Sequence, residues 1–389
     1  MTISRGLLLA VSTIFLASLV STLISCAGSS PGVFEQILSV IPDTESNRAM
    51  VAINDYVQMQ KQLKIDAPRK DAAPDEQFTF IKDLYSLDGL EKTLTLAATI
   101  GFINNNSSYL LNSLESMRNM EIGYWLIDQE ASAGWPPINM SIIKGRFNPE
   151  KSQQTLVESA KDDPPNIETY NENTIYSWGG DNEINLGKRL GPPAYDMLGR
   201  GGRFVFQKDF AIRTNQTSII KQVLDTQQGK QNSLAEVSEF SLIAKELSSH
   251  GAMSAYLTNQ TQSFEITRDL LAASSQNKTE DIDKYLAQGP ILLPYQTIGL
   301  GIAKDEKGLY GLIILVHVDA QTAAQNVGLL QQRIDQTSSF FANVKWTSIF
   351  SNSSIISQGR VLTAKLYGPD IGRNWLAWYF NHDPLILHE

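Results

Sequence analysis

Apolar and polar positions follow two rhythms along this chain, one typical of helices and one typical of strands. Apolar residues three and four positions apart predict a short helix at 34–41 and mostly helical structure over about 56–120. The same spacing predicts a helix over 234–248. There Ser233 and Glu236 have the spacing of a capping box, in which each side chain bonds the other residue's backbone N–H.

Shorter stretches with alternating polarity predict strands and hairpins. The expected single strands are 49–55, 121–128, 252–257 and 357–368, and the expected hairpins are 167–178 and 297–318. Three segments, 138–159, 202–225 and 311–335, repeat the order strand, turn, helix. This mixture predicts an α+β fold, with mixed or antiparallel sheets and helices packed on one face. Repeated strand–helix–strand units are one hypothesis for how such a fold is built.

The length of the body favours more than one domain, because single hydrophobic cores rarely grow beyond about 250–300 residues. A polar stretch near 265–290 is the best candidate for a connection between domains. We therefore expect a first α+β domain at 34–265 and a second at 290–389.

The start of the chain has the pattern of an export signal. Arg5 precedes an uncharged apolar run over 7–25, which is also long enough to cross a bilayer as a helix. The run ends in Leu23-Ile24-Ser25-Cys26, which resembles the lipobox of bacterial lipoproteins. The resemblance implies that residues 1–25 are a signal peptide and that Cys26 carries a diacylglycerol and acyl chains such as palmitate. An uncleaved membrane anchor and a plain cleaved signal are the alternatives.

Small residues follow the cysteine, so we expect 26–33 to be a flexible tether between lipid and body. Two or three acyl chains hold a protein stably at a membrane, whereas one chain does so only marginally. The resemblance thus implies a lipid-anchored protein on the extracytoplasmic face of the cell membrane, or at the outer membrane of a double-membrane host.

Charge and cysteine content exclude several functions. With 32 basic and 41 acidic side chains the formal charge is −9, which disfavours nucleic acid as a partner. The single cysteine excludes an intramolecular disulfide, a cysteine-based zinc site and an iron–sulfur cluster. No cofactor or metal is predicted.

Familiar catalytic motifs are absent from the sequence. The glycine-containing stretch 179–188 lacks the spacing of a phosphate-binding P-loop and is interpreted as a polar loop. No Gly-X-Ser-X-Gly elbow occurs. Two Ser-X-X-Lys matches, at 141–144 and 218–221, lack the companion Lys-Thr-Gly motif of penicillin-binding enzymes. The sequence therefore predicts a protein that is not an enzyme.

Two histidines and a group of aromatic residues are the remaining candidates for chemistry. His317 lies in an apolar strand and is interpreted as a core residue, while His382 and Asp383 are adjacent and poorly placed to act as a catalytic pair. Aromatic residues gather near the carboxyl end, where they form either a core plug or the wall of a ligand cleft. The cleft residues would be Trp346, Trp375, Trp378 and Tyr379.

The segments 41–44 (IPDT) and 144–150 (KGRFNPE) resemble uncharacterised bacterial envelope proteins, a resemblance that implies no site. Three hypotheses follow for a lipid-anchored body of this kind. It binds an envelope protein or other envelope component, it binds a small solute for an import system, or it is a hydrolase with unrecognised carboxylate chemistry. The first is favoured, because no catalytic motif is found.

Overall fold

The computed structural model describes residues 31–69, 72–87, 92–97, 120, 122–189, 194–196, 198–274 and 279–389. Contacts along the chain separate Met1–Gly32 from a compact unit, Val33–Glu389, and the fold below is that of the second unit. Cys26 and the signal at 1–25 lie outside the described residues, as does most of the tether.

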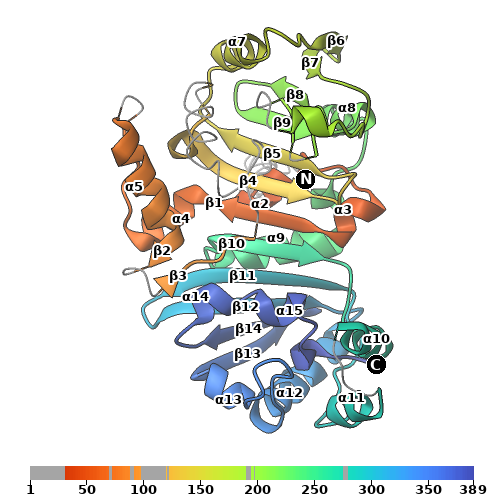
Figure 1. Cartoon of the computed structure of the whole chain (residues 1–389). Coiled ribbons are helices and arrows are strands. Elements are labelled where there is room, and N and C mark those ends of the chain that lie inside the picture. The colour runs from red at the N-terminus through yellow and green to blue at the C-terminus, as the bar shows by residue number, and fades with distance from the viewer. Residues whose placement is uncertain are drawn as a thin grey trace, which may run out of the picture. The chain divides into compact units, whose positions relative to one another are not determined.

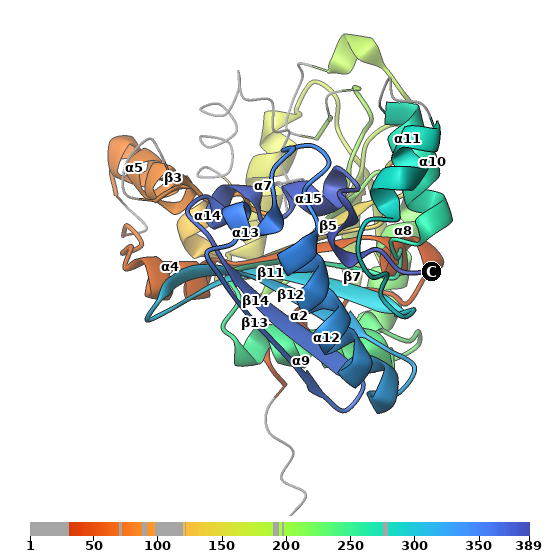
Figure 2. The same ribbon diagram turned by 90° about the horizontal axis from the view of Figure 1, so that it is seen from below.

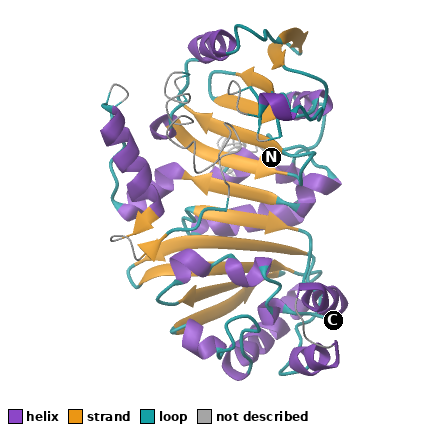
Figure 3. Cartoon of the chain, viewed as in Figure 1, coloured by secondary structure: helices purple, strands orange, loops and turns teal. Residues whose placement is uncertain are grey.

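A single twelve-stranded sheet runs through the unit, and each strand pairs with its neighbours in antiparallel fashion (Figures 1 and 3). In order across the sheet the strands are β13 (Asn352–Gln358), β14 (Val361–Tyr367), β12 (Gly308–Val316), β11 (Thr297–Asp305), β10 (Ser254–Thr258), β1 (Val51–Asp55), β4 (Ile127–Ala133), β5 (Met140–Gly145), β9 (Phe210–Thr214), β8 (Arg203–Phe206), β7 (Asn173–Ser177) and β6 (Asn166–Tyr170). A separate two-stranded sheet joins β2 (Ser86–Leu87) and β3 (Lys92–Thr93).

The two halves of the large sheet have the same topology on either side of the central pair β1–β10. Outward from β10 lie β11, β12 and then β14, the inner strand of a hairpin with β13. Outward from β1 lie β4, β5 and then β9, the inner strand of a hairpin with β8. Helix α7 (Pro149–Ser159) follows β5 as α12 (Ala320–Gln336) follows β12. The hairpin β6–β7 is an addition to the first half.

This topology clarifies the repeat that the sequence suggested. Segments 138–159 and 311–335 are equivalent strand–helix units, β5–α7 and β12–α12. Segment 202–225 is different, because it contains the hairpin β8–β9 before helix α8 (Thr217–Gln227). The expected threefold recurrence was therefore wrong at its middle member, and the sheet contains two related halves.

The boundary expected near 265–290 falls on two helices, α10 (Phe264–Ser274) and α11 (Thr279–Leu286). Residues 34–265 and 290–389, expected as two domains, contribute neighbouring strands to the one sheet, with β10 beside β11. The two expected domains thus share one continuous hydrogen-bonded sheet.

Helices cover both faces of the sheet, not the single face that we expected (Figure 2). Along β1 the side chains alternate: Val51 and Ile53 belong to one apolar core and Ala52 to the other. The core containing Val51 is covered by α2 (Val33–Leu38), α8, the 3₁₀ turn η5 (Leu234–Glu236) and α9 (Ser238–Ser249). The core containing Ala52 is covered by α4 (Tyr56–Leu63), α5 (Pro74–Tyr85), η3 (Tyr124–Leu126), α7, α12, α13 (Trp346–Ile349), α14 (Ile371–Asn374), α15 (Ala377–Phe380) and η6 (Pro384–Ile386).

Glycines set how closely two helices approach the sheet. A Cβ at Gly299 of β11 would lie 2.3 Å from Cγ2 of Ile243, so α9 could not pack at its present distance beside a larger residue. On the other face a Cβ at Gly311 of β12 would lie 3.1 Å from Cδ1 of Ile371. Because Gly311 has no side chain, α14 packs directly against this part of β12.

The structure confirms an α+β fold and most of the expected elements. The helix at 234–248 is present as η5 and α9, and the capping box of Ser233 and Glu236 forms at η5. Helix α7 begins at Pro149, after an Asn148 side chain that accepts from Lys151 N–H. Three expectations were wrong. Residues 92–97 are not helical, and residues 124–126 form a 3₁₀ turn and not a strand. Where one strand was expected at 357–368, there are two strands, β13 and β14, joined by a turn at 359–360. The expected helix at 107–117 lies outside the described residues. The remaining described elements are α3 (Glu45–Ala49) and η4 (Leu186–Lys188).

A buried polar row joins the two halves at the centre of the sheet. Asn54 of β1 is in register with Glu130 of β4 on one side and Ser254 of β10 on the other, and all three are fully buried. Ser254 Oγ donates to Asn54 Oδ1 at 2.8 Å, and Tyr56 Oη donates to Glu130 Oε2 at 2.8 Å. Burial of these groups is tolerated because they bond one another.

We predict that Asn54→Ala lowers the free energy of unfolding by about 2 kcal/mol, because it leaves a buried hydroxyl without its acceptor and opens a small cavity. The matched control is Asn352→Ala, at the exposed start of β13, with an expected effect of about 0.5 kcal/mol or less. Urea unfolding of both purified variants measures the difference. Equal destabilisation of the two would contradict a structural role for the row.

Candidate pocket beside Trp346 and Trp378

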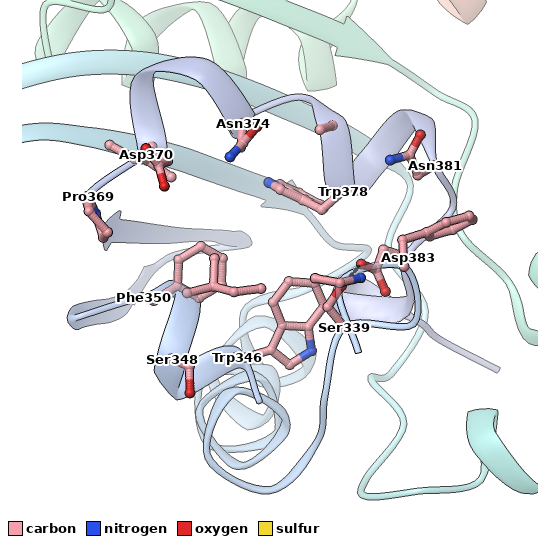
Figure 4. A pocket seen from close by; sticks show the side chains of 15 residues that line it. Ser339, Trp346, Ser348, Phe350, Pro369, Asp370, Asn374, Trp378, Asn381 and Asp383 are labelled. Atoms are coloured by element: carbon pink, nitrogen blue, oxygen red, sulfur yellow. Dashed lines mark hydrogen bonds between the residues drawn. The ribbon is translucent and has the colours of Figure 1, made fainter. Parts of the chain in front are cut away.

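A pocket of about 420 Å³ opens near the carboxyl end of the chain, on the face of the sheet covered by α12–α15 (Figure 4). One wall is formed by α13 and the turn before it, and the other by α14 and α15. Its lining residues are Ser339, Phe341, Ala342, Trp346, Ser348, Ile349, Phe350, Pro369, Asp370, Ile371, Asn374, Ala377, Trp378, Asn381 and Asp383. The volume lies in the range of pockets that hold small organic ligands.

Aromatic side chains give the pocket its apolar surface. The rings of Trp346 and Phe350 stack with centroids 5.6 Å apart and planes 5° from parallel. Trp378 lines the pocket from α15, across from Trp346 (Figure 4). Because Trp346, Phe350 and Trp378 are all buried, packing fixes these walls before any ligand binds.

The indole N–H of Trp346 is a buried donor without a hydrogen-bond partner among the described residues. A buried donor left unpaired costs about 1–3 kcal/mol. Such groups are uncommon in folded proteins.

A buried carboxyl, Asp383, lies at one end of the pocket. Its Oδ2 accepts from the Ser339 hydroxyl, and its Oδ1 accepts from the backbone N–H of Phe340 at 2.6 Å. Burial raises the pKa of Asp383 to about 6, although both hydrogen bonds favour the ionised form. The carboxyl therefore ties the turn at 339–342 to the segment that follows α15.

Arg333 of α12 holds that segment in place. Its guanidinium donates to the carbonyl oxygens of Pro384, Leu385 (3.1 Å) and Pro290 (2.7 Å), and the side chain is buried. Burial lowers the pKa of Arg333 to about 10, at which it remains charged near neutral pH. One charged side chain thus positions the backbone next to Asp383.

Polar side chains line the other parts of the pocket. Asp370, Asn374 and Asn381 follow one another along α14 and α15, and Ser348 lies on α13 (Figure 4). The side chains of Asn374 and Asn381 make no hydrogen bond to another described residue, so their amides are available to a ligand. The Asp370 carboxylate is likewise unpaired among the described residues.

The structure brings together two of the four aromatic residues proposed for a cleft. Trp346 and Trp378 line the pocket, whereas Trp375 and Tyr379 do not. Trp375 is buried against the sheet and donates from Nε1 to the Thr95 carbonyl at 2.8 Å. The Tyr379 hydroxyl donates to the Gln260 carbonyl at 3.0 Å. These two residues therefore have the packing role that a core plug requires.

Two histidines, His317 and His382, were candidates for chemistry in the sequence. His317 is fully buried: Asn326 Nδ2 donates to its Nε2 at 2.8 Å, and its Nδ1 lies 3.3 Å from the Arg360 carbonyl. Burial lowers the pKa of His317. The backbone of His382 has a positive φ of 56°. The hydrogen bonds of the Asp383 carboxylate are with Ser339 and the Phe340 N–H, and not with the adjacent His382.

The other motifs weighed in the sequence have ordinary partners. Lys188 of the 179–188 loop pairs with Asp163 at 2.6 Å, and its Nζ lies 2.8 Å from the Tyr195 hydroxyl. Lys144 donates to Gln36 Oε1 at 2.7 Å, and Lys221 pairs with Glu168 at 2.5 Å. Neither lysine is poised beside its serine as a base.

No group of three or more metal-ligating side chains occurs within the part of the chain that the structure describes. Over those same residues, no helix is both long and apolar enough to span a bilayer.

Residues 94–351 match the family described as "Protein of unknown function (DUF3352)". The chain belongs to this family. The match covers β4 to α13 and ends just before the hairpin β13–β14 and the helices α14 and α15 that complete the pocket.

Three crystal forms of TP0453 are similar to this chain among solved structures. Form III is 9% identical, with a TM-score of 0.36 over 89% of this chain and 97% of that one. Form IV is 8% identical, with a TM-score of 0.36 over 84% and 89%. Form I is 8% identical, with a TM-score of 0.35 over 91% and 98%. Scores this low support no conclusion about fold or function. No curated protein matches the chain.

We predict that Asp383 makes stability depend on pH. A carboxyl whose folded pKa is raised from 3.8 to about 6 stabilises the fold below pH 4 and loses that contribution as pH rises through 6. The change is up to about 3 kcal/mol. The unfolding free energy of the natural protein minus that of Asp383→Asn should therefore fall between pH 4 and pH 6 and then level off toward pH 7. A difference that is constant over this range would contradict the assignment.

Proposed function

We propose that this protein is a lipid-anchored, extracytoplasmic binding protein whose pocket holds a small, mainly apolar ligand. The observation that carries the proposal is the pocket itself: an apolar space of about 420 Å³ with fixed aromatic walls and a few polar groups. That combination is typical of ligand sites, where apolar contact gives affinity and a few polar groups give orientation.

The polar groups in the pocket are more suited to binding than to catalysis. Asp383 accepts two hydrogen bonds that hold a turn, and Asn374 and Asn381 are amides that neither attack nor transfer protons readily. Two further carboxyls, Asp55 and Glu130, are buried among the residues that the structure describes, and neither lines this pocket. Asp370 and Asp383 do line it, but they lie toward opposite ends (Figure 4), and Asp383 is occupied by two hydrogen bonds, so these two carboxyls do not face a shared bond as a catalytic pair would.

Anchoring through Cys26 is the second part of the proposal and rests on the sequence 23–26. Helix α2 begins at Val33, so in sequence only a short segment separates Cys26 from the body. A body so tethered would remain close to the membrane surface, where its ligand or an envelope partner would be encountered.

We predict that Cys26→Ala abolishes incorporation of radiolabelled palmitate and leaves a precursor that retains residues 1–25. Cys26→Ser, which has nearly the same size but no thiol to alkylate, should behave in the same way. Membrane fractionation and the mass of the intact protein measure both effects. Normal processing and retention at the membrane in either variant would contradict lipid anchoring.

We also predict that filling the pocket removes its ligand. Ala342 lines the pocket, and Ala342→Phe adds a ring at that wall while keeping the Ala342 backbone N–H that donates to Ser339. Ala324→Phe, on the exposed side of α12, is the matched control. Native mass spectrometry of protein purified from its own cells should show a small added mass on the natural protein and on the control, and none on Ala342→Phe. An added mass present on all three, or on none, would contradict the proposal.

A further inference from the structure

The pocket contains acidic side chains and no basic ones. Of its fifteen lining residues, Asp370 and Asp383 are carboxylic acids, and none is lysine, arginine or histidine. The two acids lie toward opposite ends of the pocket (Figure 4). The chain as a whole also carries a formal charge of −9. An anionic ligand, such as a phosphate or a fatty acid, would therefore enter with no countercharge and against repulsion.

The aromatic walls favour the opposite charge. The faces of tryptophan and phenylalanine rings carry negative electrostatic potential, and they attract a cation that lies within about 6 Å of the ring centre. Trp346, Phe350 and Trp378 are three such rings that line one cavity, and the half-exposed Phe341 is a fourth lining ring.

The two carboxylates contribute in different ways. Asp383 is already bonded to Ser339 and to the Phe340 N–H, so it adds negative charge to the pocket without offering a free oxygen. Asp370 is exposed and precedes α14 without bonding that helix's N–H groups, so both of its oxygens are open to a ligand. A charged donor entering the pocket would find its direct partner in Asp370.

Building on the proposed function, we infer that the ligand of this pocket is an organic cation, with an ammonium group on an apolar body. The ammonium group binds among the aromatic rings and the carboxylate of Asp370. The apolar body occupies the remaining space beside Ile349, Ile371 and Ala377. The amides of Asn374 and Asn381 contribute hydrogen bonds to any polar substituent of the ligand. The site therefore selects by charge as well as by shape.

The test uses three probes of similar size and different charge. They are phenyltrimethylammonium, tert-butylbenzene, which has nearly the same shape without the charge, and benzenesulfonate. We expect the purified protein to bind the cation about 10-fold more tightly than the neutral probe in calorimetric titration. Benzenesulfonate should show no binding. Ala342→Phe should abolish binding of the cation.

Variants separate charge from shape. Asp370→Asn keeps the size of the side chain and removes its charge, so it should weaken binding of the cation several-fold and leave the neutral probe unchanged. Asp281→Asn, exposed on α11 outside the pocket, is the matched control and should change neither. A loss of cation affinity in the control as large as in Asp370→Asn would overturn the assignment of Asp370.

The outcomes distinguish this inference from the proposed function. Equal affinity for the cation and the neutral probe, or preference for benzenesulfonate, would overturn the cation inference while the pocket remained a binding site. Binding of none of the probes, with an added mass still present on the natural protein and absent from Ala342→Phe, would overturn only the cation inference. Binding of none, with no added mass, would overturn both.

Discussion

The antiparallel pairing of β1 with β10 is the constraint on which the rest of this structure depends. It joins two halves of the same topology into one sheet, so each half supplies an edge that the other covers. Exposed sheet edges invite aggregation, and this pairing covers the inner edge of each half. The polar row of Asn54, Glu130 and Ser254 fixes the register of these strands, because a slip by one residue would bury its groups without partners.

The pocket arises where the two halves differ. In the first half, the chain between α7 and β8 forms the added hairpin β6–β7. In the second half, the corresponding chain between α12 and β13 forms a turn and the short helix α13, and α14 and α15 follow β14 on the same face. Gly311 lets α14 lie close to the sheet, and Arg333 holds the segment after α15 against α12. The space between these layers is the cavity that Trp346 and Trp378 enclose.

Local patterns in the sequence predicted most of the elements but not how they assemble. Ser233 and Glu236 mark a helix start by contacts within a few residues, and a short turn visible in the sequence joins the two strands of the hairpin 297–318. The continuity of the sheet depends on β1 meeting β10, some 200 residues apart, which no local pattern encodes.

The aromatic cluster showed where to look for a cleft. It could not show that Trp375 turns to the sheet while Trp378 faces the pocket. The spacing of Asp370, Asn374 and Asn381 near those aromatics was an available signal for the polar wall, and it was missed. Phe350 and the pairing of Ser339 with Asp383 depend on tertiary packing.

The central claim is that the space between Trp346 and Trp378 is a binding site and not a packing defect. A crystal structure of the protein purified from its own cells, without added ligand, tests it most directly. We expect electron density for an organic molecule between the two indoles, with Asp370 in contact with it and the side chains of Phe350 and Asp383 in the positions described. A cavity that contains only water, or one closed by rotation of Trp378 or Phe341 into it, would contradict the claim.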